Sequence, residues 1–171
     1  EITAKKEKSV GRVVNLTSAL HKNTKKFDFS DFMFEKPGAY SMFSNYSQSK
    51  LANMLFTEGL QARMDKAQKP VIVNSVHPGC VMTDVTRNMH WFLRYGEMMA
   101  LPILATIRKT PAEGAYSSVY AATASEVEEK GIKGEYIFHC QPCTKGPGVV
   151  AEDADTLWAE SEKYVKEKFN Y

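Results

Sequence analysis

The hydrophobic positions of this chain fall into short continuous runs and longer stretches with helical spacing. Short apolar runs rich in β-branched and aromatic residues predict buried strands at 12–18, 71–76 and 134–139. Helical spacing predicts helices over 46–64 and 111–124, and a terminal helix that begins at Asp153 or Asp155. Strand, helix and strand in this order predict a βαβ unit with parallel strands and a right-handed crossover.

Two stretches between these elements have a less regular pattern. Residues 19–45 predict a long loop that contains the alternating Phe27-Asp28-Phe29 and the breaker Pro37-Gly38, with Ser44 or Asn45 as the cap of the next helix. Large apolar residues crowd into 89–104. That crowding fits either ordinary core or a flexible apolar lid over a site.

Composition narrows the class of protein. A chain of 171 residues makes one domain, and a net charge of +2 with interleaved signs predicts neither a nucleic-acid nor an acidic-membrane partner. Three cysteines do not make a disulfide framework, so we expect a reducing compartment such as the cytoplasm or the cytosolic face of a membrane. No apolar run reaches ~18 residues, so we expect no transmembrane segment. Because the chain opens at Glu1 just before its first strand, we also expect that residues precede it.

Tyr46 and Lys50 are the first candidates for chemistry. Four residues apart on a helix, they share one face. At ~5 Å and an effective dielectric of ~20, an ammonium favours the phenolate by about 3 kcal/mol. That attraction is worth roughly 2 pKa units, enough to bring a tyrosine near a working pH for acid–base chemistry.

The Tyr-x-x-x-Lys spacing alone carries little information. With 8 Tyr and 17 Lys in 171 residues, about 0.8 such pairs are expected by chance, and Tyr164 with Lys168 is a second one. Context separates the two pairs, because only Tyr46 follows a strand that ends in a hydroxyl residue, Ser18, and precedes a strand that ends in a Pro-Gly turn. We therefore interpret Tyr164 as a solvated or packing residue.

Taken in order, the segments Arg12–Ser18, Tyr46–Phe56 and Val76–Thr83 resemble the short-chain dehydrogenase/reductase family. The likeness is greatest to its retinol dehydrogenase-like branch, which includes the WW-domain oxidoreductase type. It runs along nearly the whole chain but only to the C-terminal half of the family's domain. It implies an α/β fold with a partial Rossmann-type, doubly wound parallel sheet of about three strands with flanking helices.

The resemblance also implies roles for single residues. Tyr46 would exchange a proton with the substrate oxygen, Lys50 would depress the Tyr46 pKa and hold the nicotinamide ribose, and Ser18 would orient the same oxygen. Thr17 could replace Ser18, but Ser18 matches the family motif. The other expected cofactor contacts are Pro78, Gly79, Val81 and Thr83.

The implied cofactor is NAD or NADP, with NADP slightly favoured by the resemblance and neither readable from the chain. The implied substrate is a lipophilic alcohol or carbonyl compound such as a retinoid, steroid or fatty aldehyde, and a homodimer is possible in this family. The family's glycine-rich dinucleotide loop is absent between Glu1 and Tyr171. Neither Gly131 and Gly134 nor Gly146 and Gly148 are expected to replace it, because neither pair is predicted to lie in a strand-to-helix turn.

Remaining candidates have plainer explanations. Cys140 and Cys143 without a second ligand pair predict inert or loop thiols rather than a zinc site, and no metal is expected. His77 should pack or hydrogen-bond. Two hypotheses stay open: an oxidoreductase whose C-terminal portion is inactive alone, and a non-catalytic interaction module that keeps the fold.

Overall fold

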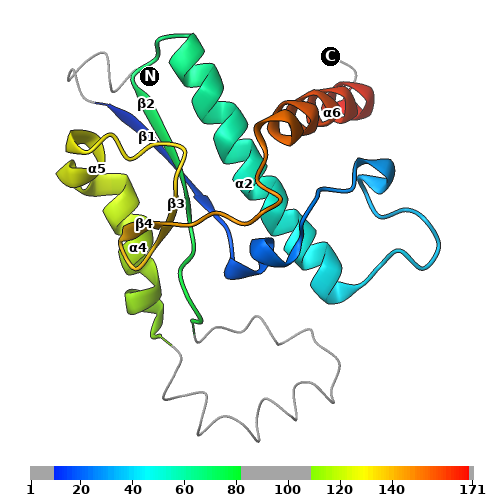
Figure 1. The fold of residues 1–171 in the computed structure, drawn as a ribbon, viewed down its shortest axis with the longest axis horizontal. Coiled ribbons are helices and arrows are strands. Elements are labelled where there is room, and N and C mark those ends of the chain that lie inside the picture. Colours follow the sequence, from blue (N-terminus) through cyan, green and yellow to red (C-terminus); the bar gives the residue numbers. More distant parts are fainter. Residues whose placement is uncertain (1–9, 82–108, 170–171) are drawn as a thin grey trace, which may run out of the picture.

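A computed structural model describes residues 10–81 and 109–169 of the chain. Its elements, in order, are β1 (Gly11–Leu16), η1 (Ala19–Asn23), η2 (Phe29–Asp31), α2 (Met42–Lys66), β2 (Val71–Val76), α4 (Pro111–Thr123), α5 (Ser125–Glu129), β3 (Tyr136–Phe138), β4 (Gln141–Cys143) and α6 (Ala151–Phe169). A four-stranded sheet lies between helices, so the predicted α/β class is confirmed (Figure 1). Thr83 and the 89–104 segment lie outside the described residues.

The sheet has the strand order β1-β2-β3-β4. β1 pairs with β2, and β2 with β3, in parallel, which confirms the parallel strands of the predicted βαβ unit. Leu16 lies opposite Val76 in the first ladder, so β1 and β2 end level with each other. The carboxyl ends of neighbouring parallel strands are where open α/β sheets place their sites.

Alternate residues of β2 face different helices. Ile72 and Val76 pack with Ala121 of α4, whereas the Ser75 hydroxyl lies 2.6 Å from the Thr57 hydroxyl of α2. The two helices therefore cover opposite faces of the sheet, as Figure 1 shows.

The first strand is less buried than predicted. β2 is buried almost throughout, but β1 is only half-buried and Leu16 at its end is 53% exposed. The physical reason is its place in the sheet, because in the described part of the chain β1 has a neighbour on one side only.

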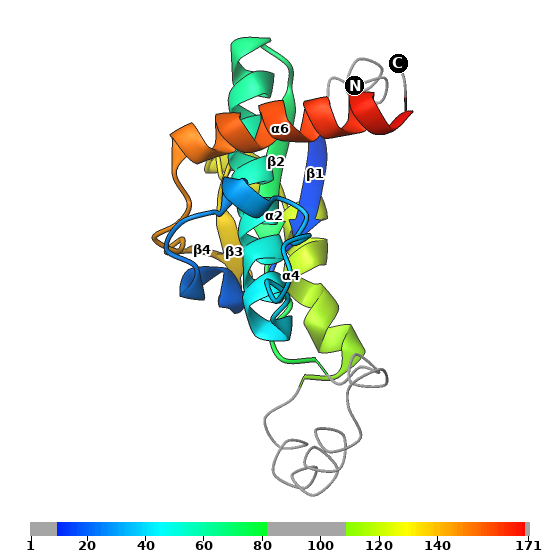
Figure 2. The same cartoon turned by 90° about the vertical axis from the view of Figure 1, so that its right-hand side faces the viewer.

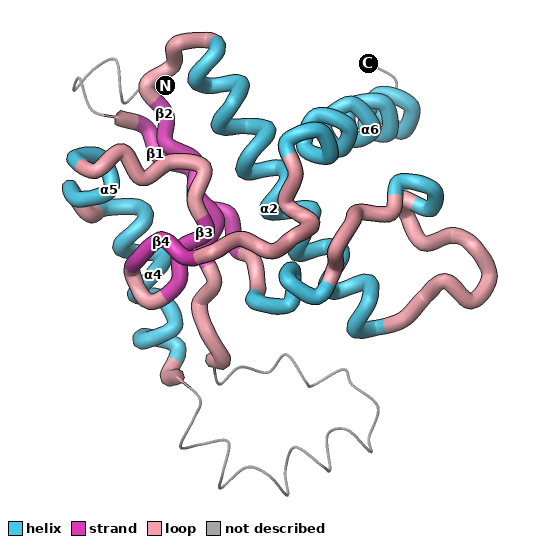
Figure 3. Tube along the Cα trace, viewed as in Figure 1, coloured by secondary structure: helices cyan, strands magenta, loops and turns pink. Residues whose placement is uncertain are grey.

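The second core lies between α2 and α6, which crosses α2 (Figure 2). Leu51 and Leu55 of α2 pack there with Ala154 and Leu157 of α6. Phe27 from the predicted long loop is buried in the same cluster. Figure 3 shows that residues 24–41 are mostly loop apart from η2, so this loop is anchored by its aromatic residues.

Helix boundaries differ from prediction by a few residues. α2 begins after Ser41 rather than after Ser44 or Asn45, and Asn45 instead accepts a hydrogen bond from the Ser41 amide through its side chain. α6 begins at Ala151, ahead of the predicted Asp153 or Asp155. α4 begins at Pro111 as predicted, with a capping box between Thr110 and Glu113.

A fourth strand, β4, was not predicted. It pairs antiparallel with β3 across a two-residue turn at His139 and Cys140, whose φ angles are +52° and +58°. Turns of this kind normally carry Asn and Gly, so their usual sequence signal is missing here. Among the helices described, none combines the length and apolar character needed to cross a membrane.

Candidate functional site

The candidate site lies where β1 and β2 end. The Thr17 amide donates to the Val76 carbonyl at 2.8 Å, so the ladder extends one residue past Leu16. Ser18 and Pro78 follow these neighbouring strand ends within two residues. The fold thus brings the hydroxyl after one strand and the Pro-Gly turn after the next to the same edge of the sheet.

Tyr46 and Lys50 lie together on α2 beside this edge. The Lys50 ammonium is 5.6 Å from the centre of the Tyr46 ring, and it also donates to the Leu16 carbonyl at 3.4 Å. Tyr46 is 42% exposed, which leaves its phenol accessible. The pairing expected from the i,i+4 spacing is therefore present, at the end of β1.

The hydroxyls of Thr17 and Ser18 have different surroundings. The buried Thr17 hydroxyl donates to the Lys50 carbonyl at 2.9 Å. The Ser18 hydroxyl oxygen accepts from the Leu20 amide at 3.3 Å, so its own proton has no protein acceptor among the described residues. Ser18 is therefore the hydroxyl able to donate to a ligand, whereas Thr17 holds β1 against α2.

A buried polar network supports the helix behind Lys50. The Thr57 hydroxyl accepts from the Asn15 amide at 2.8 Å, lies 2.6 Å from the Ser75 hydroxyl and donates to the Asn53 carbonyl at 2.9 Å. The Asn53 side chain in turn donates to the Leu16 carbonyl at 2.8 Å, the same oxygen that Lys50 approaches. These residues were not predicted from the sequence, although polar residues on two strands and a helix otherwise predicted as apolar were a usable signal.

The Pro78-Gly79 turn packs closely against the Lys109 side chain. Gly79 has φ of +90°, a conformation that favours glycine, and a Cβ there would lie 3.2 Å from the Lys109 side chain. Val81 forms a parallel bridge with Lys109, which ties this turn to the residue before α4's cap.

His77 packs and hydrogen-bonds, as predicted. Its ring stacks on Phe138, and its Nδ1 accepts from the Gly79 amide at 3.4 Å. Burial, together with the nearby Lys109 ammonium, lowers the pKa of His77 to about 4. His77 is therefore neutral at neutral pH.

His21, which follows Ser18 by three residues, was also missed. Its ring is fully buried, and its two nitrogens contact the Ser18 carbonyl at 2.6 Å and the Gly146 amide at 3.0 Å. Burial is the main cause that lowers the pKa of His21. The ring therefore links the Ser18 turn to the connection between β4 and α6.

Gly146 and Gly148 were expected to lie outside a strand-to-helix turn. That prediction is wrong, because both lie in the connection from β4 to α6. Their surroundings still do not suit a phosphate. A Cβ on Gly148 would lie 2.5 Å from the Thr24 carbonyl oxygen, and one on Gly146 would lie 2.9 Å from the His21 ring. These glycines allow two parts of the chain to pack closely, so their backbone does not face open space.

The other candidates have no assembled site around them. Cys140 and Cys143 are free thiols, the latter in β4 rather than in a loop. No group of three or more metal-ligating side chains occurs in residues 10–81 and 109–169. Tyr164 is partly exposed on α6, far along the chain from the strand ends.

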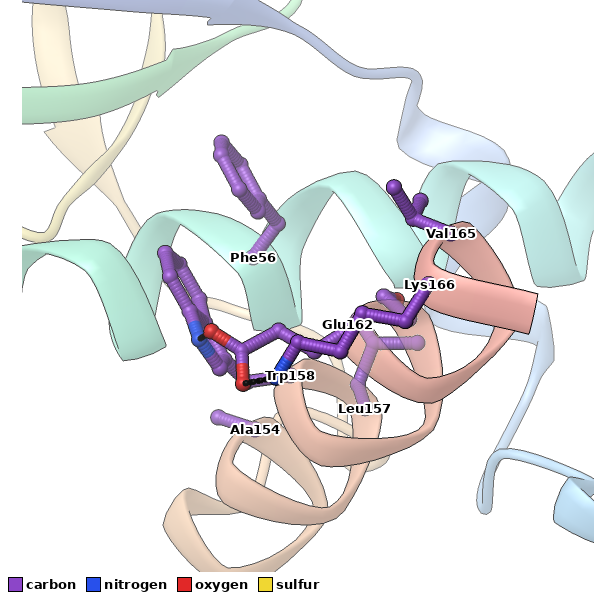
Figure 4. A pocket seen from close by; sticks show the side chains of 8 residues that line it. Phe56, Ala154, Leu157, Trp158, Glu162, Val165 and Lys166 are labelled. Atoms are coloured by element: carbon purple, nitrogen blue, oxygen red, sulfur yellow. Dashed lines mark hydrogen bonds and ion pairs between the residues drawn. The ribbon is translucent and has the colours of Figure 1, made fainter. Parts of the chain in front are cut away.

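An apolar cavity of about 260 Å³ lies between α2 and α6 (Figure 4). The Trp158 ring stacks on Phe56 and donates to Glu162 at 2.9 Å. The Arg63 guanidinium lies 4.2 Å from the centre of the same indole ring. None of the residues predicted for catalysis lines this cavity.

Comparisons with known proteins agree with the fold. No protein-family model matches the chain. It is 37% identical over 161 residues to retinol dehydrogenase 14 from Homo sapiens, covering 94% of this chain and 46% of that protein. It is 33% identical over 158 residues to short-chain dehydrogenase TIC 32 B, chloroplastic, from Brassica napus, covering 91% of this chain and 47% of that protein.

A solved structure of an uncharacterised protein from Mycobacterium paratuberculosis also matches, with a TM-score of 0.66 and 27% identity. That match covers 92% of this chain and 51% of the other. The chain belongs to the short-chain dehydrogenase/reductase family and is similar to its retinol dehydrogenase-like members, as predicted. It spans about half the length of the curated relatives that it matches.

Proposed function

We propose that this chain carries the catalytic portion of an oxidoreductase that transfers a hydride between a nicotinamide cofactor and a lipophilic alcohol or carbonyl compound. The observation that carries this proposal is the position of the Tyr46–Lys50 pair. The Lys50 ammonium contacts the Leu16 carbonyl, and the Thr17 hydroxyl donates to the Lys50 carbonyl, so the pair is fixed beside Ser18.

In this proposal the Tyr46 hydroxyl passes a proton to the substrate oxygen during reduction and takes it back during oxidation. A positioned acid–base group of this kind typically contributes 10²–10⁴-fold to the rate. The Lys50 ammonium stabilises the phenolate form, and the free Ser18 proton donates to the same substrate oxygen. The Tyr46 and Ser18 hydroxyls then both act on the substrate oxygen, where charge changes during the reaction.

The residues present fit the nicotinamide end of the cofactor. The Lys50 ammonium has three donors, and its described contacts are a long bond to Leu16 and the Tyr46 ring, with no carboxylate. It can therefore donate to ribose hydroxyls. Pro78, Gly79 and Val81 would lie against the nicotinamide, with Thr83 proposed as a further contact. Hydride transfer is the chemistry that the bound nicotinamide supplies.

A lipophilic substrate is proposed from the relatives. Retinol dehydrogenase 14 and polyprenol dehydrogenase, both from Homo sapiens, are named for lipophilic alcohols. The proposal extends this substrate class to this chain. The slight preference for NADP over NAD is a separate proposal that rests on the family resemblance. A homodimer is a further proposal from the same family.

We also propose that residues 1–171 form the C-terminal portion of one dehydrogenase domain. The described residues contain no open glycine-rich turn from a strand into a helix that could hold a pyrophosphate at a helix N-terminus. The 171-residue chain alone should therefore bind the cofactor weakly and show no turnover.

The test compares two proteins. One is the isolated 171-residue chain, and the other is the complete gene product, meaning this chain with any sequence that its gene encodes before Glu1. Cofactor-dependent oxidation of retinol and a long-chain prenol should occur in the complete gene product and be absent from the isolated chain. No turnover of any lipophilic alcohol or aldehyde by the complete gene product would favour the non-catalytic interaction module instead.

A further inference from the structure

His21 is held by two hydrogen bonds that together define its protonation. A carbonyl oxygen can only accept and a backbone amide can only donate, so Nδ1 donates to Ser18 and Nε2 accepts from Gly146. The imidazole is therefore neutral, with its proton on Nδ1. The burial that lowers its pKa keeps it in this form.

Neighbouring residues pack closely against the His21 ring. The Tyr136 ring of β3 contacts His21 edge-on, with 4.8 Å between ring centres. A side chain on Gly146 would collide with the His21 ring at 2.9 Å, so the connection before α6 reaches the imidazole only because this residue is glycine. His21 thus lies in a fitted site, with neighbours from β3 and from the connection between β4 and α6.

The residue that receives the Nδ1 bond is Ser18 itself. Ser18 precedes η1, a single short 3₁₀ turn in which the His21 amide also donates to the Ser18 carbonyl, at 3.1 Å. Isolated 3₁₀ turns have poor hydrogen-bond geometry and little stability of their own. Thr17, the residue before Ser18, is tied to β2 and α2, and the imidazole adds a contact that ties the Ser18 carbonyl to the connection before α6.

We propose that His21 is a positioning residue, which holds the backbone of Ser18 so that its hydroxyl points at the substrate oxygen. This inference rests on the proposed function, in which Ser18 orients that oxygen. His21 exchanges no proton with the substrate, because both of its nitrogens are already occupied. Its effect on turnover passes through Ser18.

A double-mutant cycle in the complete gene product tests whether the effect of His21 on turnover passes through Ser18. His21→Ala should lower kcat by about tenfold or more, since small displacements of a positioning contact have large kinetic effects, while KM changes by less than about threefold. His21→Asn, whose amide can still donate to the Ser18 carbonyl, should recover part of the loss. In a Ser18→Ala background, His21→Ala should change kcat by less than about twofold.

A buried aromatic residue in the other core is the matched control. Phe27 packs between α2 and α6, so Phe27→Leu should change kcat by the same factor in both backgrounds. An equal loss from His21→Ala in both backgrounds would show a merely structural role and overturn the proposal. If Ser18→Ala itself left turnover unchanged, the proposed role of Ser18 would be wrong, and the role of His21 with it.

A spectroscopic measurement covers the case in which His21→Ala does not fold. Nitrogen-15 NMR of the unsubstituted complete gene product should show the His21 ring neutral and protonated at Nδ1. A ring protonated at Nε2, or charged at neutral pH, would contradict the two hydrogen bonds and overturn the proposal without any variant.

Discussion

The Thr17 hydroxyl donates a 2.9 Å hydrogen bond to the backbone carbonyl of Lys50. This bond joins the residue before Ser18 to the helical turn that carries Tyr46, although the two lie 33 positions apart in the chain. The Thr17 hydroxyl therefore serves the fold, whereas the proton of the neighbouring Ser18 hydroxyl has no protein acceptor among the described residues.

Substituting each hydroxyl should separate these tasks. In the complete gene product, Ser18→Ala should lower kcat by roughly 10²-fold, because the substrate oxygen loses a donor. Thr17→Val should instead cost about 1 kcal/mol of unfolding free energy, the net value of one hydrogen bond, and leave kcat within a few-fold. Steady-state kinetics and denaturant unfolding measure both effects. A larger kcat loss for Thr17→Val than for Ser18→Ala would reverse our assignment.

His77 should make stability depend on pH. Its pKa is about 4 in the folded chain against 6.5 for an ordinary histidine, so the unfolded chain takes up the proton first as pH falls. Its contribution to stability is complete above pH 6.5 and is lost progressively as pH falls from 6.5 to 4. Thermal unfolding across this range should therefore show a falling Tm.

The control for this prediction is His77→Asn, whose side-chain oxygen can still accept from Gly79 but does not titrate. Its Tm should fall less steeply between the same pH values. Some decline should remain, because burial also lowers the pKa of His21. Identical pH profiles for the two proteins would rule out His77 as the cause.

Gly148→Ala should destabilise the fold. The new Cβ would lie 2.5 Å from the Thr24 carbonyl oxygen and 2.9 Å from the Leu51 side chain, both closer than normal packing distance. Overpacking of this kind costs about 1–3 kcal/mol. Gly11→Ala is the matched control, because its Cβ would meet Val71 at an ordinary 3.5 Å. Comparable unfolding free energies for the two variants would mean that the connection before α6 packs less tightly than described.

The isolated 171-residue chain should self-associate. β1 has an unpaired edge in the described part of the sheet, and apolar side chains such as Leu16 at its end and Phe43 on α2 are exposed. Unpaired edges and bare apolar surface both promote association. Sedimentation velocity should show species that grow with concentration. A stable monomer that binds NADH or NADPH at micromolar concentration, measured by calorimetric titration, would contradict this prediction and the expected inactivity together.

Sequence patterns predicted the parallel βαβ core well. The spacing of hydrophobic residues and the residue composition are strong signals where residues are buried on both faces. β2 and the helix α4 begin at the predicted residues, the latter because Pro111 and the Thr110 capping box are local signals. The half-burial of β1 depends on which strand lies beside it. That is a property of the whole sheet and is absent from the local pattern.

Parts of the candidate site could not be read from spacing alone. Tyr46, Lys50 and Ser18 were found from their order along the chain, but the His21 ring is held in part by Gly146, which lies 125 positions away. β4 was missed because His139 and Cys140 adopt positive φ without the usual glycine or asparagine. Both features come from tertiary contacts that fix a conformation which local sequence does not favour.

Tyr46→Phe, compared with Tyr164→Phe, tests the proposed catalytic role most directly. Both tyrosines precede a lysine at i+4 on a helix, and the lysine beside Tyr46 donates to the Leu16 carbonyl at the end of β1. In the complete gene product, Tyr46→Phe should lower kcat at least ~10²-fold, since it removes the acid–base group, while Tyr164→Phe stays near the unsubstituted value. Equal kcat values for the two variants would contradict the assignment of Tyr46 as the catalytic residue.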